Sequence, residues 1–232
     1  MMIQLLNNFI NLFYPRSCIL CRNPLIEHER HICLNCLQNL PETCYHTNKG
    51  NPARALFAGF PQVNEVTAFL FFEKDGKAQR LIHSFKYYGN KSLAEYLGRI
   101  AAIELKDAGF YASVDTLIPV PLHPDKEKKR GYNQSELIAN GISSVYGCSV
   151  DRTSIKRIAY TVSQTRKSVY ERHVNVEKIF KPTDTESLFG KHVLLVDDVI
   201  TTGATTSACI EALLEIPEIK ISIFSLAITM EN

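Results

Sequence analysis

The run of residues 193–206 constrains the fold of this chain more than any other feature. Its first four residues, 193–196, are valine and leucine, which is typical of a buried strand in a parallel sheet. Two adjacent carboxylates, Asp197 and Asp198, follow at the end of that strand. A loop of hydroxyl side chains with one glycine comes next, and residues 207–214 have the composition of a helix. The sequence therefore predicts a strand, a short polar loop and a helix in direct succession.

This succession predicts an anion site, because the free backbone N–H groups and the dipole of the helix both point at the loop. Asp197 and Asp198 would repel an anion, but they can accept hydrogen bonds from sugar hydroxyls beside it. A phosphate and a diol held side by side describe a ribose 5-phosphate. The alternative is that residues 193–196 form an ordinary core strand and that the acidic pair only helps to start a helix.

The length and charge of the chain set further bounds. A chain of 232 residues can hold one α/β domain and a small appendage. The net charge of +2 gives no overall attraction to nucleic acid or membrane. Between residues 119 and 181, however, 12 lysines and arginines stand against 6 acidic residues. This middle third is where we expect a polyanionic ligand, with a solvated basic face as the alternative.

The first 14 residues are apolar on one side at helical spacing, which predicts a short amphipathic helix docked on the body of the protein. The segment has no positive start and no small-residue cleavage site, so we do not expect a signal peptide. No apolar run approaches the ~18 residues of a membrane span, and we expect a cytoplasmic protein without membrane partners.

Four cysteines form two Cys-x2-Cys pairs separated by eleven residues, a pattern that places four thiolates at tetrahedral corners: Cys18, Cys21, Cys33 and Cys36. We expect them to bind a structural zinc ion with no open coordination position. The alternative, two disulfides, requires an oxidising compartment. Turn-forming residues at 48–52 and 59–61 follow this module. We therefore expect an N-terminal helix and zinc module in residues 1–61 and a main domain in residues 62–232.

Strand and helix patterns alternate along the main domain, which predicts an α/β fold with a mostly parallel sheet and helices on both faces. Ligands of such sheets bind outside the carboxyl ends of the strands. We expect strands at 66–72, 115–120, 154–158, 193–196 and 219–229, and helices at 78–85, 92–107, 134–146 and 207–214.

Two further segments carry chemistry. Residues 125–135 read as a basic loop after the strand at 115–120, and we expect four of its residues to contact phosphates: Lys128, Lys129, Arg130 and Gly131. On its own the segment favours a solvated lysine-rich turn, and we expect the phosphate contacts because it accompanies the run at 193–206. Residues 161–181 form a long polar connection, which is typical of a functional segment or of disorder.

The run at 193–206 resembles the ligand-binding sequence of type I phosphoribosyltransferases, which bind phosphoribosyl pyrophosphate (PRPP). The cysteine pairs, residues 85–89, 119–122 and 130–134, and the polar segment before Phe180 together are similar to the ComF family (ComFC/GntX-like). The resemblance implies a type I phosphoribosyltransferase-like domain with a small N-terminal zinc module of four cysteines. It implies that Asp197 and Asp198 hold the ribose hydroxyls, and that the following residues hold the 5′-phosphate: Thr201, Thr202, Gly203, Ala204 and Thr205.

The resemblance further implies a Mg²⁺–PRPP complex whose pyrophosphate a nitrogen acceptor displaces, and a lid over PRPP at residues 161–181. The catalytic residues are then the acidic pair, with Arg172 and Lys167 of the lid as candidates to stabilise the leaving pyrophosphate. It links the chain to competence and DNA uptake, and leaves open both the acceptor and whether any reaction is catalysed. The alternative is a non-catalytic adaptor that keeps a nucleotide pocket and binds single-stranded DNA or a competence helicase, with Tyr87, Tyr88, Tyr132 and Tyr170 as stacking residues. The oligomeric state stays open.

Overall fold

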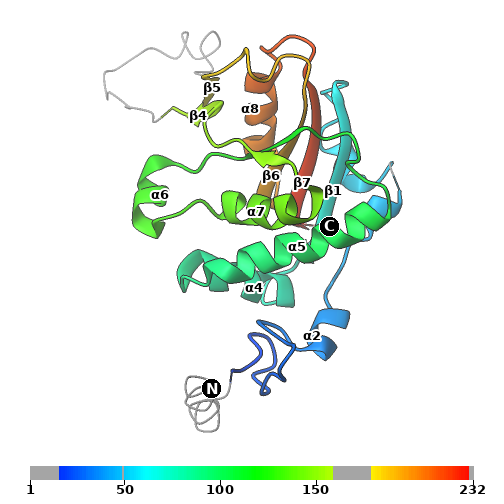
Figure 1. Cartoon of the computed structure of the whole chain (residues 1–232), viewed down its shortest axis with the longest axis vertical. Coiled ribbons are helices and arrows are strands. Elements are labelled where there is room, and N and C mark those ends of the chain that lie inside the picture. Colours follow the sequence, from blue (N-terminus) through cyan, green and yellow to red (C-terminus); the bar gives the residue numbers. More distant parts are fainter. Residues whose placement is uncertain (1–15, 49, 159–178, 230–232) are drawn as a thin grey trace, which may run out of the picture.

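The computed structural model describes residues 16–48, 50–158 and 179–229 (Figure 1). The expected N-terminal helix and most of the expected lid, Lys167 and Arg172 included, lie outside these residues. The elements in chain order are α2 (Leu34–Gln38), η1 (Tyr45–Thr47), α3 (Pro52–Ala55), β1 (Val63–Phe72), α4 (Lys77–Tyr87), α5 (Lys91–Asp107), β2 (Thr116–Pro119), α6 (Pro124–Arg130), α7 (Gln134–Tyr146), β3 (Ser149–Val150), β4 (Ile155–Arg157), β5 (Phe180–Pro182), β6 (His192–Ile200), α8 (Ala204–Leu213) and β7 (Lys220–Thr229).

A five-stranded parallel sheet forms the centre of the molecule, in the order β1-β7-β6-β2-β3. Its two central strands, β6 and β7, are buried along most of their length. Helices cover both faces of a parallel sheet of this kind, so side chains on both faces of the central strands are buried and the strands need no alternation of apolar and polar residues. The expected mostly parallel α/β fold is confirmed.

Two separate apolar cores lie on the two faces of the sheet. On one face α4, α5 and α7 pack against alternate residues of the central strands, such as Leu194 and Phe224. On the other face α3 and α8 pack against the residues between them, such as Val193 and Ile223. Figure 1 shows α7 and α5 crossing in front of the sheet. The carboxyl ends of all the long strands therefore open at one edge between the two helical layers.

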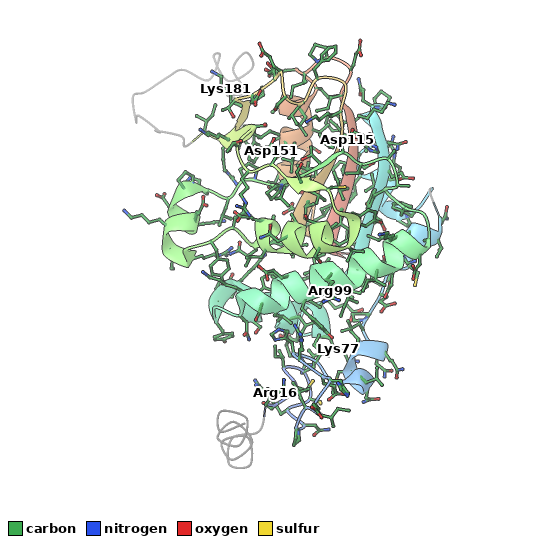
Figure 2. All side chains as sticks on the ribbon, in the orientation of Figure 1. Arg16, Lys77, Arg99, Asp115, Asp151 and Lys181 are labelled. Atoms are coloured by element: carbon green, nitrogen blue, oxygen red, sulfur yellow. The ribbon has the colours of Figure 1, made fainter. Side chains whose placement is uncertain are left out.

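The cysteine segment is docked on α4 and α5 rather than held apart. Cys18, Leu20, Ile32 and Leu40 belong to the same apolar core as the inner faces of these helices. Figure 2 shows Lys77 at this junction, where its ammonium group donates to the carbonyl of Asn39. The small segment thus shares the core of the large domain.

Residues 41–60 lead from the cysteine segment to the sheet and contact β1 directly. Glu42 forms a bridge with Leu70, and the side-chain amide of Asn51 donates to the carbonyl of Val66 at 2.8 Å. Phe57 is buried in the core beneath α8. The expected division at residue 61 stays a prediction.

Three local expectations are wrong. The signature strand does not end at Val196, because β6 continues to pair with β7 as far as Ile200, and both carboxylates lie inside it. Helix α8 begins at Ala204 rather than at residue 207. The strand expected at 154–158 lies outside the main sheet, since β4 pairs antiparallel with β5.

The basic segment after β2 is also not a loop: residues 124–130 form helix α6. Pro124 occupies the first turn, the ring of His123 accepts from the N–H of Asp125 at 3.2 Å, and Gly131 ends the helix with φ 74°. These are ordinary helix start and stop signals. Without an apolar stripe, the helix left no periodic pattern in the sequence.

Candidate PRPP site and cysteine cluster

The acidic pair lies near the carboxyl end of β6, and its two carboxylates have different environments. Asp197 is 8% exposed and accepts from the hydroxyls of Thr206 at 3.2 Å and Ser135 at 3.5 Å. Its Oδ1 also accepts from the backbone N–H of Asp198 at 2.8 Å. Asp198 is half-buried, and its Oδ2 lies 2.8 Å from the Nζ of Lys86 on α4. One carboxylate is therefore held by neutral donors and the other by a cation.

The burial of Asp197 sets its protonation. Burial, followed by the nearby charge of Asp198, raises the pKa of Asp197 from 3.8 to about 7. The N–H of Asp198, the charge of Lys86 and the hydroxyl of Thr206 act in the opposite direction. Asp197 therefore exchanges its proton near neutral pH, where the binding of hydroxyl donors would favour the ionised form.

The loop after β6 presents hydroxyls and backbone N–H groups to solvent. Gly203 has φ 76° and turns the chain into α8, and a Cβ there would lie 3.4 Å from the ring of Phe57. Thr201, Thr202 and Thr205 are exposed around this turn. The first N–H groups of an α-helix have no partner within the helix, so this loop has the donors that a phosphate requires.

The segment after β2 folds back onto the acidic pair. The side chain of Asn133 donates to the carbonyl of Val120 at 3.0 Å and accepts from the N–H of Ser135 at 3.0 Å. The guanidinium of Arg130 donates to Gln134 at 2.7 Å. These contacts fix the end of α6 and the start of α7 beside the acidic pair.

Two adjoining pockets result. The inner pocket, of about 170 Å³, has among its lining residues Val120, Leu122, Arg130, Asp197, Asp198 and Thr205. The outer pocket, of about 410 Å³, is lined by Lys86, Tyr87, Gly89, Lys126, Lys129, Arg130 and Tyr132. Lys86, Lys126 and Arg130 line both, so the two pockets are contiguous.

The structure brings some of the expected site residues together and not others. Asp197, Asp198, Thr205 and Arg130 share the inner pocket, and Lys129 lines the outer one. The other expected residues of the described chain line neither pocket: Thr201, Thr202, Gly203, Ala204, Lys128 and Gly131. Residues 201–204 nevertheless adjoin Thr205 in the chain. A Cβ on Gly131 would meet no protein atom within 4 Å, and its φ of 74° suits glycine at the turn after α6. The contact of Gly131 with a phosphate stays a prediction.

Sequence reasoning missed several residues of the site. Lys86 and Lys126 come from separate helices, Arg157 from β4, and Ser135 and Thr206 from the first turns of α7 and α8. Lys86 lies within the segment 85–89 that carries part of the ComF resemblance, and this was the one signal available for it.

The four cysteines of the two Cys-x2-Cys pairs converge, with all their Sγ atoms within 4.8 Å of one another. The Sγ atoms of Cys21 and Cys33 are 3.7 Å apart. Sulfur atoms around a tetrahedral ion with Zn–S bonds of about 2.3 Å stand ~3.8 Å apart, so the donor set fits zinc. Burial acts to raise the pKa of Cys18, but backbone N–H groups, first that of Cys21, lower it to about 6. No disulfide joins any of the seven cysteines.

No helix within the described ranges is both long and apolar enough to cross a membrane.

Comparison with known families identifies the class of protein to which this fold and site belong. The family model of the phosphoribosyl transferase domain matches residues 112–228. The chain belongs to the phosphoribosyl transferase domain family.

Curated relatives extend the likeness to the cysteine segment. DNA utilization protein YhgH of Escherichia coli O157:H7 is 28% identical over 234 residues, which cover 93% of this chain and 98% of that protein. Competence protein F of Haemophilus influenzae is 29% identical over 63% of this chain and 66% of its own length. Competence protein ComFC of Bacillus subtilis is 33% identical over 43% of this chain and 38% of its own. The resemblance to the ComF family is confirmed.

Among solved structures, the allosteric regulatory enzyme of purine biosynthesis matches 61% of this chain and 30% of its own, at 19% identity and a TM-score of 0.43.

Proposed function

We propose that the inner pocket binds PRPP. The observation that carries the proposal is the acidic pair of β6 opening into one pocket with Thr205 and Arg130. Asp197 and Asp198 accept hydrogen bonds from the ribose 2′- and 3′-hydroxyls. Residues 201–205 bind the 5′-phosphate with their hydroxyls and N–H groups. Arg130 faces the pyrophosphate, where charge-assisted hydrogen bonds are strongest.

The reaction that this arrangement supports is transfer of the phosphoribosyl group to a nitrogen acceptor. A bond forms between the acceptor nitrogen and C1 of the ribose while the bond from C1 to the pyrophosphate oxygen breaks, and the pyrophosphate leaves with the electron pair. Mg²⁺ bound with PRPP supplies charge neutralisation for the leaving group. This chain's residues position the ribose and stabilise the pyrophosphate charge. Lys167 and Arg172 remain candidates for the same role.

Isothermal titration of the full-length, zinc-loaded protein with PRPP and Mg²⁺ tests the proposal. We expect PRPP to bind and ribose 5-phosphate to bind much more weakly, because ribose 5-phosphate lacks the pyrophosphate. The double variant Asp197→Asn, Asp198→Asn should weaken PRPP binding by about 100-fold or more, since it removes two charged acceptors. The exposed Asp107→Asn serves as the control. Unchanged PRPP affinity in the double variant would reject the assignment.

For the cysteine cluster we propose a structural zinc ion held by Cys18, Cys21, Cys33 and Cys36. Four protein thiolates complete a tetrahedral site and leave no position for substrate, so the ion stabilises the fold of residues 16–40. The location of the protein in the cytoplasm remains a prediction.

A second candidate function is a nucleic-acid adaptor. Tyr87 and Tyr88 at the end of α4 are 64% and 82% exposed, and Lys126 and Arg130 lie beside Tyr87 around the outer pocket. Exposed rings among cations suit the stacking of single-stranded bases. The names of the relatives, competence and DNA utilization, support a role near DNA. The partner in this second candidate function is single-stranded DNA or a helicase. A salt-dependent DNA affinity that is indifferent to PRPP and to the double variant would favour the adaptor.

A further inference from the structure

The outer pocket is larger than the inner one, and one of its walls comes from an element that lies outside the matched family domain. It lies between the end of α4 and helix α6, and it meets the inner pocket at Lys86, Lys126 and Arg130. Lys86 and Tyr87 precede residue 112, where the match to the family domain begins. The outer pocket therefore adds a wall that is specific to this chain's N-terminal half.

All the charged side chains that line the outer pocket are positive. Lys86, Lys126, Lys129 and Arg130 line it, and no carboxylate does. The ammonium group of Lys86 already neutralises Asp198 at 2.8 Å. Within the described part of the chain, Lys126 and Lys129 form no ion pair. Two cations are therefore available to an anion that is additional to the groups PRPP would bring to the inner pocket.

The outer pocket also offers aromatic surface. Tyr87 is exposed, with the guanidinium of Arg130 at 5.5 Å from its ring centroid. Tyr132 is fixed, because its hydroxyl donates to the carbonyl of Phe85 and the Nζ of Lys91 lies 4.7 Å from its ring centroid. A rigid ring, an accessible ring and free cations together fit a planar ligand that carries a phosphate.

We propose that the outer pocket binds the second substrate and that this substrate is a nucleotide rather than a free base. Its phosphate contacts Lys126 and Lys129, and its ring lies against Tyr87. This inference rests on the proposed function, because a ring nitrogen of the nucleotide is then the nucleophile of the transfer described above. The inner pocket is left to PRPP.

The experiment is isothermal titration of the full-length, zinc-loaded protein with AMP, using adenosine and inorganic phosphate as probes of each half alone. We expect AMP to bind at least about tenfold more tightly than adenosine or inorganic phosphate does. Lys129→Ala should weaken AMP binding about tenfold, and Tyr87→Ala should do the same while Tyr87→Phe keeps the affinity. Lys220→Ala, at the opposite edge of the sheet, removes the same charge and should leave the affinity unchanged.

The double variant Asp197→Asn, Asp198→Asn separates the two proposals. The double variant should lose its affinity for PRPP and keep its affinity for AMP. Absence of AMP binding in a protein that binds PRPP overturns the outer-pocket proposal alone, whereas AMP binding without PRPP binding overturns the proposed function. If Lys129→Ala weakens the binding of PRPP as much as that of AMP, or if adenosine binds as tightly as AMP, the outer pocket is not a nucleotide site.

Discussion

The proposed role of Asp197 in ribose binding comes at the expense of stability. In the unfolded chain its pKa is near 3.8, and burial raises it to about 7 in the folded protein. The folded state therefore binds more protons than the unfolded state between about pH 4 and pH 7, so the contribution of this group to stability falls as the pH rises through that range. The carboxylate is charged and costly at the pH where it would hold a ribose.

Replacing Asp197 with asparagine should show this cost directly. Asparagine stays neutral at all pH values, so the melting temperature of Asp197→Asn relative to the native protein should rise between pH 5 and pH 8 in the absence of ligand. Differential scanning calorimetry at the two pH values measures it. A difference that is the same at both would mean that Asp197 does not titrate in this range.

Lys86 illustrates a residue whose role the sequence did not reveal. It sits in a helix, between buried Phe85 and exposed Tyr87, where a lysine is usually a solvated surface residue. Its contact with Asp198 joins residues 112 positions apart in the chain. Spacing along a sequence carries no information about such a contact, because packing of α4 against the sheet creates it.

At the scale of elements, the close crossing of α5 and α7 depends on two glycines. A Cβ on Gly141 would lie 2.1 Å from the carbonyl oxygen of Glu95, and one on Gly98 would lie 2.3 Å from that of Ile138. Both contacts are with backbone, so neither helix can yield by moving a side chain. Helix α7 begins at the wall of the inner pocket, and this crossing therefore also positions Ser135.

Substitution Gly141→Ala should destabilise the protein by about 1–3 kcal/mol or more, although alanine is the better helix former, because the two backbones must separate. Urea unfolding followed by circular dichroism gives the free energy. Gly59→Ala, where a Cβ meets nothing within 4 Å, is the matched control. Equal stability of the two variants would show that the crossing has room for a methyl group.

On the scale of the whole molecule, the cysteine segment shares one apolar core with the sheet and helices of the main domain. Leu20 and Ile32 are buried in the same core as Leu81 and Phe85 of α4. The end of α4 in turn carries Lys86 and Tyr87 into the two pockets. Loss of the metal should therefore affect stability beyond residues 16–40.

Removal of zinc tests this coupling. The native protein should contain one zinc ion per chain, and Cys36→Ser should lose it and lower the melting temperature of the whole protein, because the ion is bound only by the folded segment. Elemental analysis and calorimetry make the two measurements, with Cys44→Ser, an exposed cysteine outside the cluster, as the control. Full zinc content in Cys36→Ser would reject the four-cysteine site.

The sequence by itself determined the class of fold, the strand–loop–helix unit at 193–206 and the four cysteines that converge. These features follow from local rules. Apolar runs form buried strands, short polar loops precede helices, and the Cys-x2-Cys spacing lets two thiolates reach the same metal ion. Only the tertiary structure decided that α6 is a helix whose cations line a pocket, that β6 carries its carboxylates inside the strand, and that Lys86 pairs with Asp198. These depend on contacts between segments distant in the chain, whose geometry comes from the packing of the helical layers on the sheet.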